Sequence, residues 1–203
     1  MRSLSEIETV SKRASRAAGY SWGICEEIGK NIRLLEMFGL PGIKNLNDYF
    51  DKKKNQKFEN LKLINAENKS TKFQYCPIIS GTSLLDQIKS LDSLKEIKFE
   101  QIAYPLLFLP FVSRASEIIG KRLLLKFDSY EFLLNFNNNI FSNFINNKII
   151  TIANIVTIRL LENTDLFSEN EWNQLYKLSE DTFVEEKDSL KFSAAGAGLT
   201  DND

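Results

Sequence analysis

The sequence predicts an α+β fold, and three features of the 203-residue chain indicate it. Near the N-terminus apolar residues recur at intervals of three and four, as amphipathic helices require. From 121 to 161 short apolar runs are broken by polar turns, and 149–161 is rich in β-branched residues, which is typical of antiparallel strands. We therefore expect two N-terminal helices, a central apolar helix, an antiparallel sheet, a C-terminal helix and a Gly-rich tail.

The composition excludes several classes of function. Lys and Arg number 26 and Asp and Glu 27, so the formal net charge is -1, whereas dedicated nucleic-acid binders are usually basic. The chain has no His, which excludes Ser-His-Asp and Cys-His catalysis and His-ligated zinc or haem. Two Cys do not make a disulfide scaffold, so we expect free thiols and a cytoplasmic protein.

Two helices are predicted before residue 45. Ser3 and Glu6 have the spacing of a capping box, and apolar positions follow it to about residue 17. Ser21 is a candidate cap for the second helix, and Gly39 stands where a left-handed residue commonly ends one.

A second face of that helix carries Trp22, Glu26, Gly29 and Arg33. One interpretation is helix packing at Gly29 beside a solvated ion pair of Glu26 with Lys30. The other is that this face lines a pocket. The sequence leaves both open.

In the middle of the chain we expect a basic connector, a short strand and a helix. Residues 51–72 hold seven Lys and three acidic residues, which indicates a basic connector. Residues 72–76 are expected to form a short strand ending at Cys76. The polar turn 80–83 then precedes a helix that carries Asp86, and amides at such a helix start can hold an anion.

Residues 96–103 are predicted to be a strand and 106–119 an apolar helix. Ser113 and Arg114 interrupt the apolar pattern of that helix. A buried Arg needs a carboxylate partner, from Glu117 or from a ligand; otherwise Arg114 faces water.

The C-terminal part begins with a predicted hairpin and a long strand over 149–161. Ser168 and Glu171 fit a second capping box at the start of a helix that reaches about Lys187. We expect Trp172, Leu175 and Leu178 to form its inner face.

The chain is expected to be a single domain over 1–203. We divide it into a helical part (1–45), the basic connector (51–72), an α+β core (73–187) and a Gly-rich acidic tail (188–203). The first residues are charged and include no apolar segment, so we expect no secretory signal, and no apolar run is long enough to span a membrane.

Several short motifs together resemble a family of small bacterial proteins classed as a domain of unknown function. They are the opening S-L-S-E-I-E, the stretch A-A-G-Y-S-W-G with Glu26 and Glu27, and the ending G-A-G-L-T-D-N-D. The resemblance implies a cytosolic bacterial protein whose C-terminal tail has a purpose. It implies no activity, and Lys191 stands near a position where the family pattern has an Arg.

The favoured hypothesis is a small-molecule metabolic enzyme, of isomerase, lyase or hydrolase type, or the partner of one. Without His, acid–base work falls to carboxylates, Lys, Tyr or Cys. The candidate catalytic residues are Glu26, Glu27, Cys76 and Asp86. The candidate residues for a small anionic ligand are Trp22, Ser113, Arg114, Lys191, Gly196, Gly198, Asp201 and Asp203. No metal site is assigned, and the cofactor, if there is one, is unknown.

The alternative is a non-catalytic subunit or assembly protein whose C-terminal tail docks in a neighbouring subunit. Both hypotheses favour a homo-oligomer or a partner subunit, with no nucleic acid and no membrane. An enzyme should gather Glu26, Arg114 and the tail around one pocket, whereas an assembly protein should keep them apart.

Overall fold

The computed structural model describes residues 2–145, 147–162 and 164–182. The chain divides into two compact units, Met1–Asn163 and Thr164–Asp203, and each is described by itself. Within the described residues there are six helices and one mixed six-stranded sheet, which confirms the α+β class. None of the helices in this part of the chain has the length and apolar character that crossing a membrane requires.

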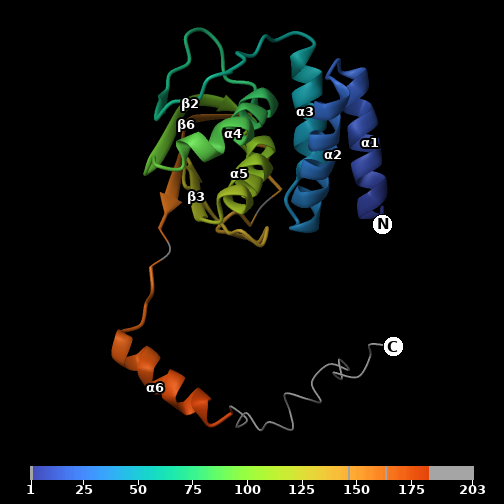
Figure 1. The fold of residues 1–203 in the computed structure, drawn as a ribbon. Coiled ribbons are helices and arrows are strands. Elements are labelled where there is room, and N and C mark those ends of the chain that lie inside the picture. The colour runs from blue at the N-terminus through green and yellow to red at the C-terminus, as the bar shows by residue number, and fades with distance from the viewer. Residues whose placement is uncertain (1, 146, 163, 183–203) are drawn as a thin grey trace, which may run out of the picture. The chain divides into compact units, whose positions relative to one another are not determined.

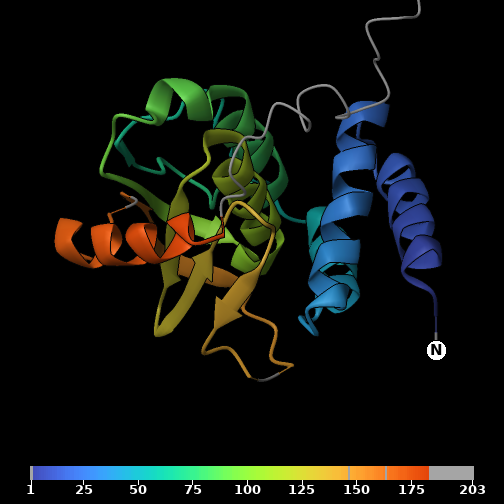
Figure 2. The ribbon, with the colours of Figure 1, turned by 60° about the horizontal axis from the view of Figure 1, so that its bottom comes forward.

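The first unit opens with two antiparallel helices that lie side by side, α1 (Leu4–Ala17) and α2 (Trp22–Met37) (Figures 1 and 2). Ser3 caps α1 as predicted, because its hydroxyl accepts a hydrogen bond from the amide of Glu6 at 3.1 Å. Gly29 lets the two helices approach closely, since a Cβ there would stand 2.8 Å from the carbonyl oxygen of Glu8. Helix packing at Gly29, part of the first interpretation, is therefore correct. The ion pair predicted with it is wrong, because Glu26 pairs with Lys12 and Lys30 pairs with Glu27.

A third helix, α3 (Gly42–Lys53), was not predicted. It begins directly after Pro41 with a Gly and contains Asn45, Asn47 and Asp48, all weak helix formers. Its stability comes from packing, because it lies against α2 and α5 with its apolar side buried. Only the end of α3 falls within the predicted connector.

The sheet has the strand order β1-β2-β6-β3-β4-β5. Neighbouring strands from β2 to β5 pair antiparallel, whereas β1 pairs parallel with β2, so the predicted antiparallel sheet is correct except at this edge. The strands are β1 (Glu67–Asn68), β2 (Glu96–Ala103), β3 (Arg122–Phe127), β4 (Tyr130–Leu134), β5 (Ile140–Ser142) and β6 (Ile152–Leu161).

Two helices, α4 (Pro77–Leu91) and α5 (Pro105–Ile119), lie together against the sheet (Figure 1). The helix α5 is central, because it contacts the sheet, α4, and also α2 and α3. The predicted turn over 80–83 is wrong: these residues lie inside α4, and Ser80 and Gly81 are fully buried. Gly81 is needed there, since a Cβ would overlap the ring of Phe111 on α5.

In the second unit the described residues form α6 (Glu169–Glu180). The predicted capping box is present, with hydrogen bonds in both directions between Ser168 and Glu171. Within the described residues of the second unit taken by itself, nothing covers the predicted inner face: the exposed fractions of Trp172, Leu175 and Leu178 are 51%, 68% and 66%. The pattern fixed which face of the helix is apolar, but burial depends on a partner that a local pattern does not supply.

Candidate functional site

Cys76 is the residue from which the best-defined site is built. It is the N-cap of α4, and its Sγ accepts a hydrogen bond from the amide of Ile79 at 3.5 Å. Pro77 occupies the first position of the helix, where a missing N–H costs nothing. The thiol is thus held at the start of a helix. The strand expected over 72–76 is reduced to isolated parallel bridges of Tyr75 with Glu59 and with Ile102.

Two tyrosine hydroxyls meet this thiol. The Oη of Tyr49 lies 3.0 Å from Cys76 Sγ and 3.0 Å from the Oη of Tyr20, which lies 3.9 Å from the same sulfur. All three side chains are buried. Burial, reinforced by the nearby thiol, raises the pKa of Tyr20 and of Tyr49 well above the ordinary value. Both phenols are therefore protonated at neutral pH and remain hydrogen-bond donors.

Lys53, at the end of α3, brings a positive charge to this cluster. Its Nζ lies 3.8 Å from the centroid of the Tyr20 ring and donates a hydrogen bond to the carbonyl of Ala18 at 3.3 Å. Partial burial lowers the pKa of Lys53, and the neighbouring Cys76 acts in the opposite direction. The ammonium group is held by a ring face and a carbonyl, both of which leave its charge unneutralised.

A cavity of about 530 Å³ opens onto these four side chains. We call it the Tyr–Cys pocket and define it by Tyr20, Tyr49, Lys53 and Cys76. The remaining described residues around it supply a second Lys, amides, a hydroxyl and apolar side chains, and they include no Asp or Glu. The pocket therefore combines positive charge, protonated hydroxyls and a thiol without a competing carboxylate.

A strained residue lies behind the pocket. Tyr104, the N-cap of α5, adopts φ 45° and ψ 62°, a left-handed conformation that bulky residues rarely take. Its hydroxyl donates a hydrogen bond of 2.5 Å to Asp48, and its ring packs edge-on against Tyr49 with centroids 5.5 Å apart. Strain of this kind persists where the surroundings impose it, and it is concentrated at functional sites.

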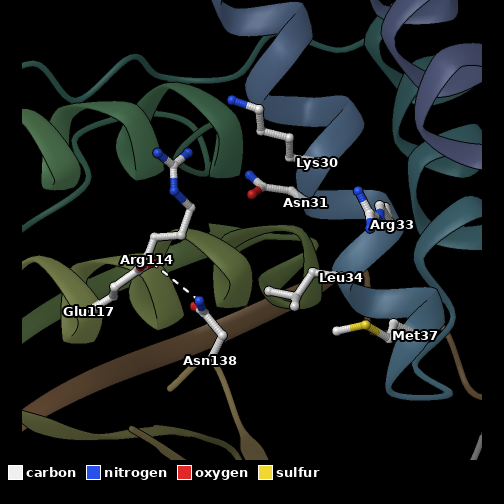
Figure 3. Close-up of a pocket in the computed structure, with 8 residues that line it drawn as sticks. All are labelled: Lys30, Asn31, Arg33, Leu34, Met37, Arg114, Glu117 and Asn138. Carbon is white, nitrogen blue, oxygen red and sulfur yellow. Dashed lines mark hydrogen bonds between the residues drawn. The ribbon is translucent and has the colours of Figure 1, made fainter. Parts of the chain in front are cut away.

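A second cavity, of about 290 Å³, lies between α2 and α5 (Figure 3). We call it the α2–α5 pocket and define it by Lys30, Asn31 and Arg114. Arg114 forms an ion pair with Glu27 of α2, so neither Glu117 nor water alone is its partner. Ser113, the residue before it, is fully buried.

The structure places the other predicted residues apart from both pockets. Glu26 pairs with Lys12 of α1 at 3.0 Å and lies away from the α2–α5 pocket. The carboxylate that pairs with Lys30 and Arg114 is that of Glu27. Trp22 is 54% exposed and lies under the Arg16 guanidinium, while Asp86 is on the exposed side of α4. The predicted ligand residues in the tail, Lys191, Gly196, Gly198, Asp201 and Asp203, lie outside the described residues.

Sequence reasoning missed Tyr20, Tyr49 and Lys53. A signal existed for two of them, because Tyr49 and Lys53 are four residues apart and share a face of α3. It went unused because the helix itself was not predicted. No signal linked Tyr20 to Cys76, which lies 56 residues further along the chain. In the described part of the chain no group of three or more Cys, Asp or Glu is arranged to hold a metal ion.

Residues 2–75 match the model of a family described as "Protein of unknown function (DUF3726)", which confirms the predicted resemblance to a family of unknown function. The match ends just before Cys76 and leaves the C-terminal motif outside it. Comparisons with curated proteins and with solved structures find no match. The function must therefore be argued from the site.

Proposed function

We propose that the protein is a small-molecule enzyme that acts on an anionic substrate in the Tyr–Cys pocket, without His. Cys76 is the reacting group, Tyr49 is its hydrogen-bonding partner, and Lys53 attracts the anion. The observation that carries the proposal is the contact of a buried thiol with two buried phenols at the wall of an open cavity. Isomerase, lyase or hydrolase chemistry fits such a set of groups.

The arrangement of donors supports a reactive role for the sulfur. The hydroxyl of Tyr49 and the amide of Ile79 both reach Sγ, from α3 and from α4. Buried structural thiols behave as small apolar groups and rarely have such partners. Cys25 provides the contrast, because it is fully buried and its own thiol donates to the carbonyl of Tyr20 at 3.5 Å.

The charge around the pocket supports an anionic substrate. Lys53 and Lys57 line it, and the described lining residues contain no carboxylate that would neutralise them. The rest is neutral and partly aromatic, including Phe58, whose ring packs against Tyr49. A small molecule with one anionic group and an uncharged body would find matching partners here.

The test is alkylation of the two thiols by a neutral and by an anionic reagent, iodoacetamide and iodoacetate, followed by peptide mass spectrometry. We expect Cys76 to react faster than Cys25, which lines no part of the pocket. Compared with the same residue in the urea-unfolded chain, folded Cys76 should favour iodoacetate over iodoacetamide by about fivefold or more because of Lys53.

Matched variants give the test its controls. Lys53→Met should abolish the preference for iodoacetate while leaving the reaction with iodoacetamide, and Lys54→Met, whose partner is the exposed Asp51, should leave both unchanged. Tyr49→Phe should slow both reagents. A folded protein in which Cys76 is as inert as Cys25, or shows no preference for the anion, would overturn the proposal.

A second candidate function, assembly, is favoured by the exposed apolar face of α6. An apolar helix face of this kind is typical of a protein-binding surface. Light scattering should then show that Trp172→Ser with Leu175→Ser lowers the mass of an oligomer. A monomeric wild-type protein at micromolar concentration would remove this candidate and leave the enzyme proposal untouched.

A further inference from the structure

The α2–α5 pocket is separate from the Tyr–Cys pocket, and the two share no lining residue. It lies where the middle of α2 faces the second half of α5 (Figure 3). The side chains of Lys30 and Asn31 extend from α2 toward the space in which the Arg114 guanidinium lies. The apolar part of the wall comes from Leu34 and Met37.

The positive charges are concentrated at one end of this pocket. The carboxylate of Glu27 serves two cations there, because it pairs with Arg114 and also lies 3.6 Å from the Nζ of Lys30. A third lining cation, Arg33, pairs with Glu8 at 3.0 Å. Glu117 also lines the pocket and keeps its negative charge, since its partner at 3.2 Å is the uncharged Asn138, but the Arg114 guanidinium points away from it, toward Lys30 and Asn31 (Figure 3). At the Lys30–Arg114 end, two cations therefore share one carboxylate.

Asn31 adds an unused hydrogen-bond donor to this positive charge. Its side chain lines the pocket and is buried, with an exposed fraction of 4%, and its Nδ2 has no hydrogen-bond partner among the described residues. Buried amide groups are nearly always hydrogen-bonded, and leaving one unpaired costs about 1–3 kcal/mol. An anionic acceptor that enters the pocket beside Arg114 would accept a hydrogen bond from Asn31 Nδ2 and would also lie next to the cations.

We propose that the α2–α5 pocket binds a small aliphatic carboxylate. One carboxylate oxygen accepts from Asn31 Nδ2 and the other from the Arg114 guanidinium, whose planar fork matches a carboxylate. The short alkyl chain lies against Leu34 and Met37. A cavity of about 290 Å³ is at the small end of the range for ligand pockets, which limits the ligand to a few carbon atoms.

The probe is butyrate, measured by calorimetric titration and by ligand-observed NMR, with butanol, butylamine and inorganic phosphate as comparisons. We expect butyrate to bind and butanol and butylamine not to bind. Inorganic phosphate is expected to bind at least about tenfold more weakly, because it gains nothing from the apolar wall. Equal binding of phosphate and butyrate would overturn the carboxylate assignment, and so would binding of butanol.

The variants locate the site. Asn31→Asp keeps the shape of the side chain but replaces the donor by a negative charge, so it should weaken butyrate binding about tenfold or more. Arg114→Lys keeps the charge but loses the planar guanidinium, so it should weaken butyrate binding severalfold. If Asn31→Asp does not fold, this second variant still tests whether butyrate binds in the α2–α5 pocket. Lys54→Met, which removes an exposed cation outside both pockets, should change the affinity less than about twofold. Loss of butyrate binding in Lys53→Met but not in Asn31→Asp would place butyrate in the Tyr–Cys pocket and overturn the assignment.

Absence of butyrate binding by the folded wild-type protein, or binding that Asn31→Asp and Arg114→Lys leave unchanged, would overturn the inference. Its failure is distinct from failure of the proposed function. The first is read from butyrate affinity, and the second is read from the alkylation of Cys76.

Discussion

The two pockets differ in the kind of polar group that they bury. At the Tyr–Cys pocket the deepest groups are neutral hydroxyls and a thiol that bind one another, and the charge of Lys53 lies at the margin. At the α2–α5 pocket the side chains of Arg114 and Glu27 are ionised partners with exposed fractions of 32% and 24%. The fully buried groups are uncharged and the charged groups stay partly exposed, because an ion loses more hydration energy than a hydroxyl when water is removed. Each prediction below tests one part of this contrast.

The largest effect is expected where both pockets depend on the same contact. Gly81→Ala places a methyl group into the ring of Phe111 and forces apart α4 and α5, which carry Cys76 and Arg114. We expect the free energy of unfolding to fall by about 3 kcal/mol or more. Urea denaturation measures it. Gly23→Ala is the control, since nothing lies within 4 Å of that Cβ, and equal stability of the two variants would contradict the packing described.

The second prediction concerns alkaline pH, which should affect the hydrogen-bonded tyrosines of the Tyr–Cys pocket and not the Glu27–Arg114 ion pair. The pKa of Tyr20 and Tyr49 is raised in the folded state, so the unfolded chain loses these protons first as the pH rises. Stability is therefore full below the ordinary tyrosine pKa. Between about pH 9 and pH 11 it should fall by about 1.4 kcal/mol for each of the two tyrosines. Lys53, whose pKa is lowered, acts in the opposite direction, whereas burial raises the pKa of Cys25, Tyr75 and Tyr104 and adds to the alkaline loss.

Urea denaturation at several pH values gives the slope. Tyr49→Phe should remove about half of the loss attributed to the two tyrosines. Arg114→Gln should lower stability at every pH and leave the slope as it is. A slope that Tyr49→Phe does not change would contradict the assignment of part of the alkaline loss to Tyr20 and Tyr49.

The third prediction concerns the ionised network. Glu27→Gln removes the carboxylate that Lys30 and Arg114 share, and the cost should be about 1–2 kcal/mol because the site is only partly accessible to water. Glu26→Gln is a matched control one residue away, where an exposed pair with Lys12 is lost and no measurable change is expected. Equal effects of the two substitutions on the unfolding midpoint would contradict the distinction between an exposed and a partly buried pair.

The smallest effect is expected at Trp22, which the sequence suggested as a ligand contact. Trp22→Ala removes an exposed ring stacked under Arg16 and should cost about 0.5–1 kcal/mol. Butyrate affinity and the alkylation rate of Cys76 should not change. A loss of either would return Trp22 to the candidate ligand residues and connect it with one of the two pockets.

Two helices, one predicted and one not, show how much a local sequence pattern determines. The start of α6 was predicted to the residue, because a capping box is a contact between positions three apart. The same pattern does not say what covers the apolar face, and within their own unit Trp172 and Leu175 are exposed. The opposite holds for α3, whose residues are weak helix formers and which is stabilised by α2 and α5.

By itself the sequence determined the α+β class, the serine caps of α1 and α6, the β hairpin and the exclusion of every mechanism that needs His. The predicted cap at Ser21 is at the N-cap position of α2, but its side chain makes no capping hydrogen bond. It also named Cys76, Glu27 and Arg114 as candidates. Only the tertiary structure decided what each of them meets. The contacts of Cys76 with Tyr49 and Tyr20 join residues 27 and 56 apart, and the partner of Arg114 is on another helix. Local patterns reach a few residues along the chain, whereas a site is made where distant segments pack together, and packing is settled by the whole core.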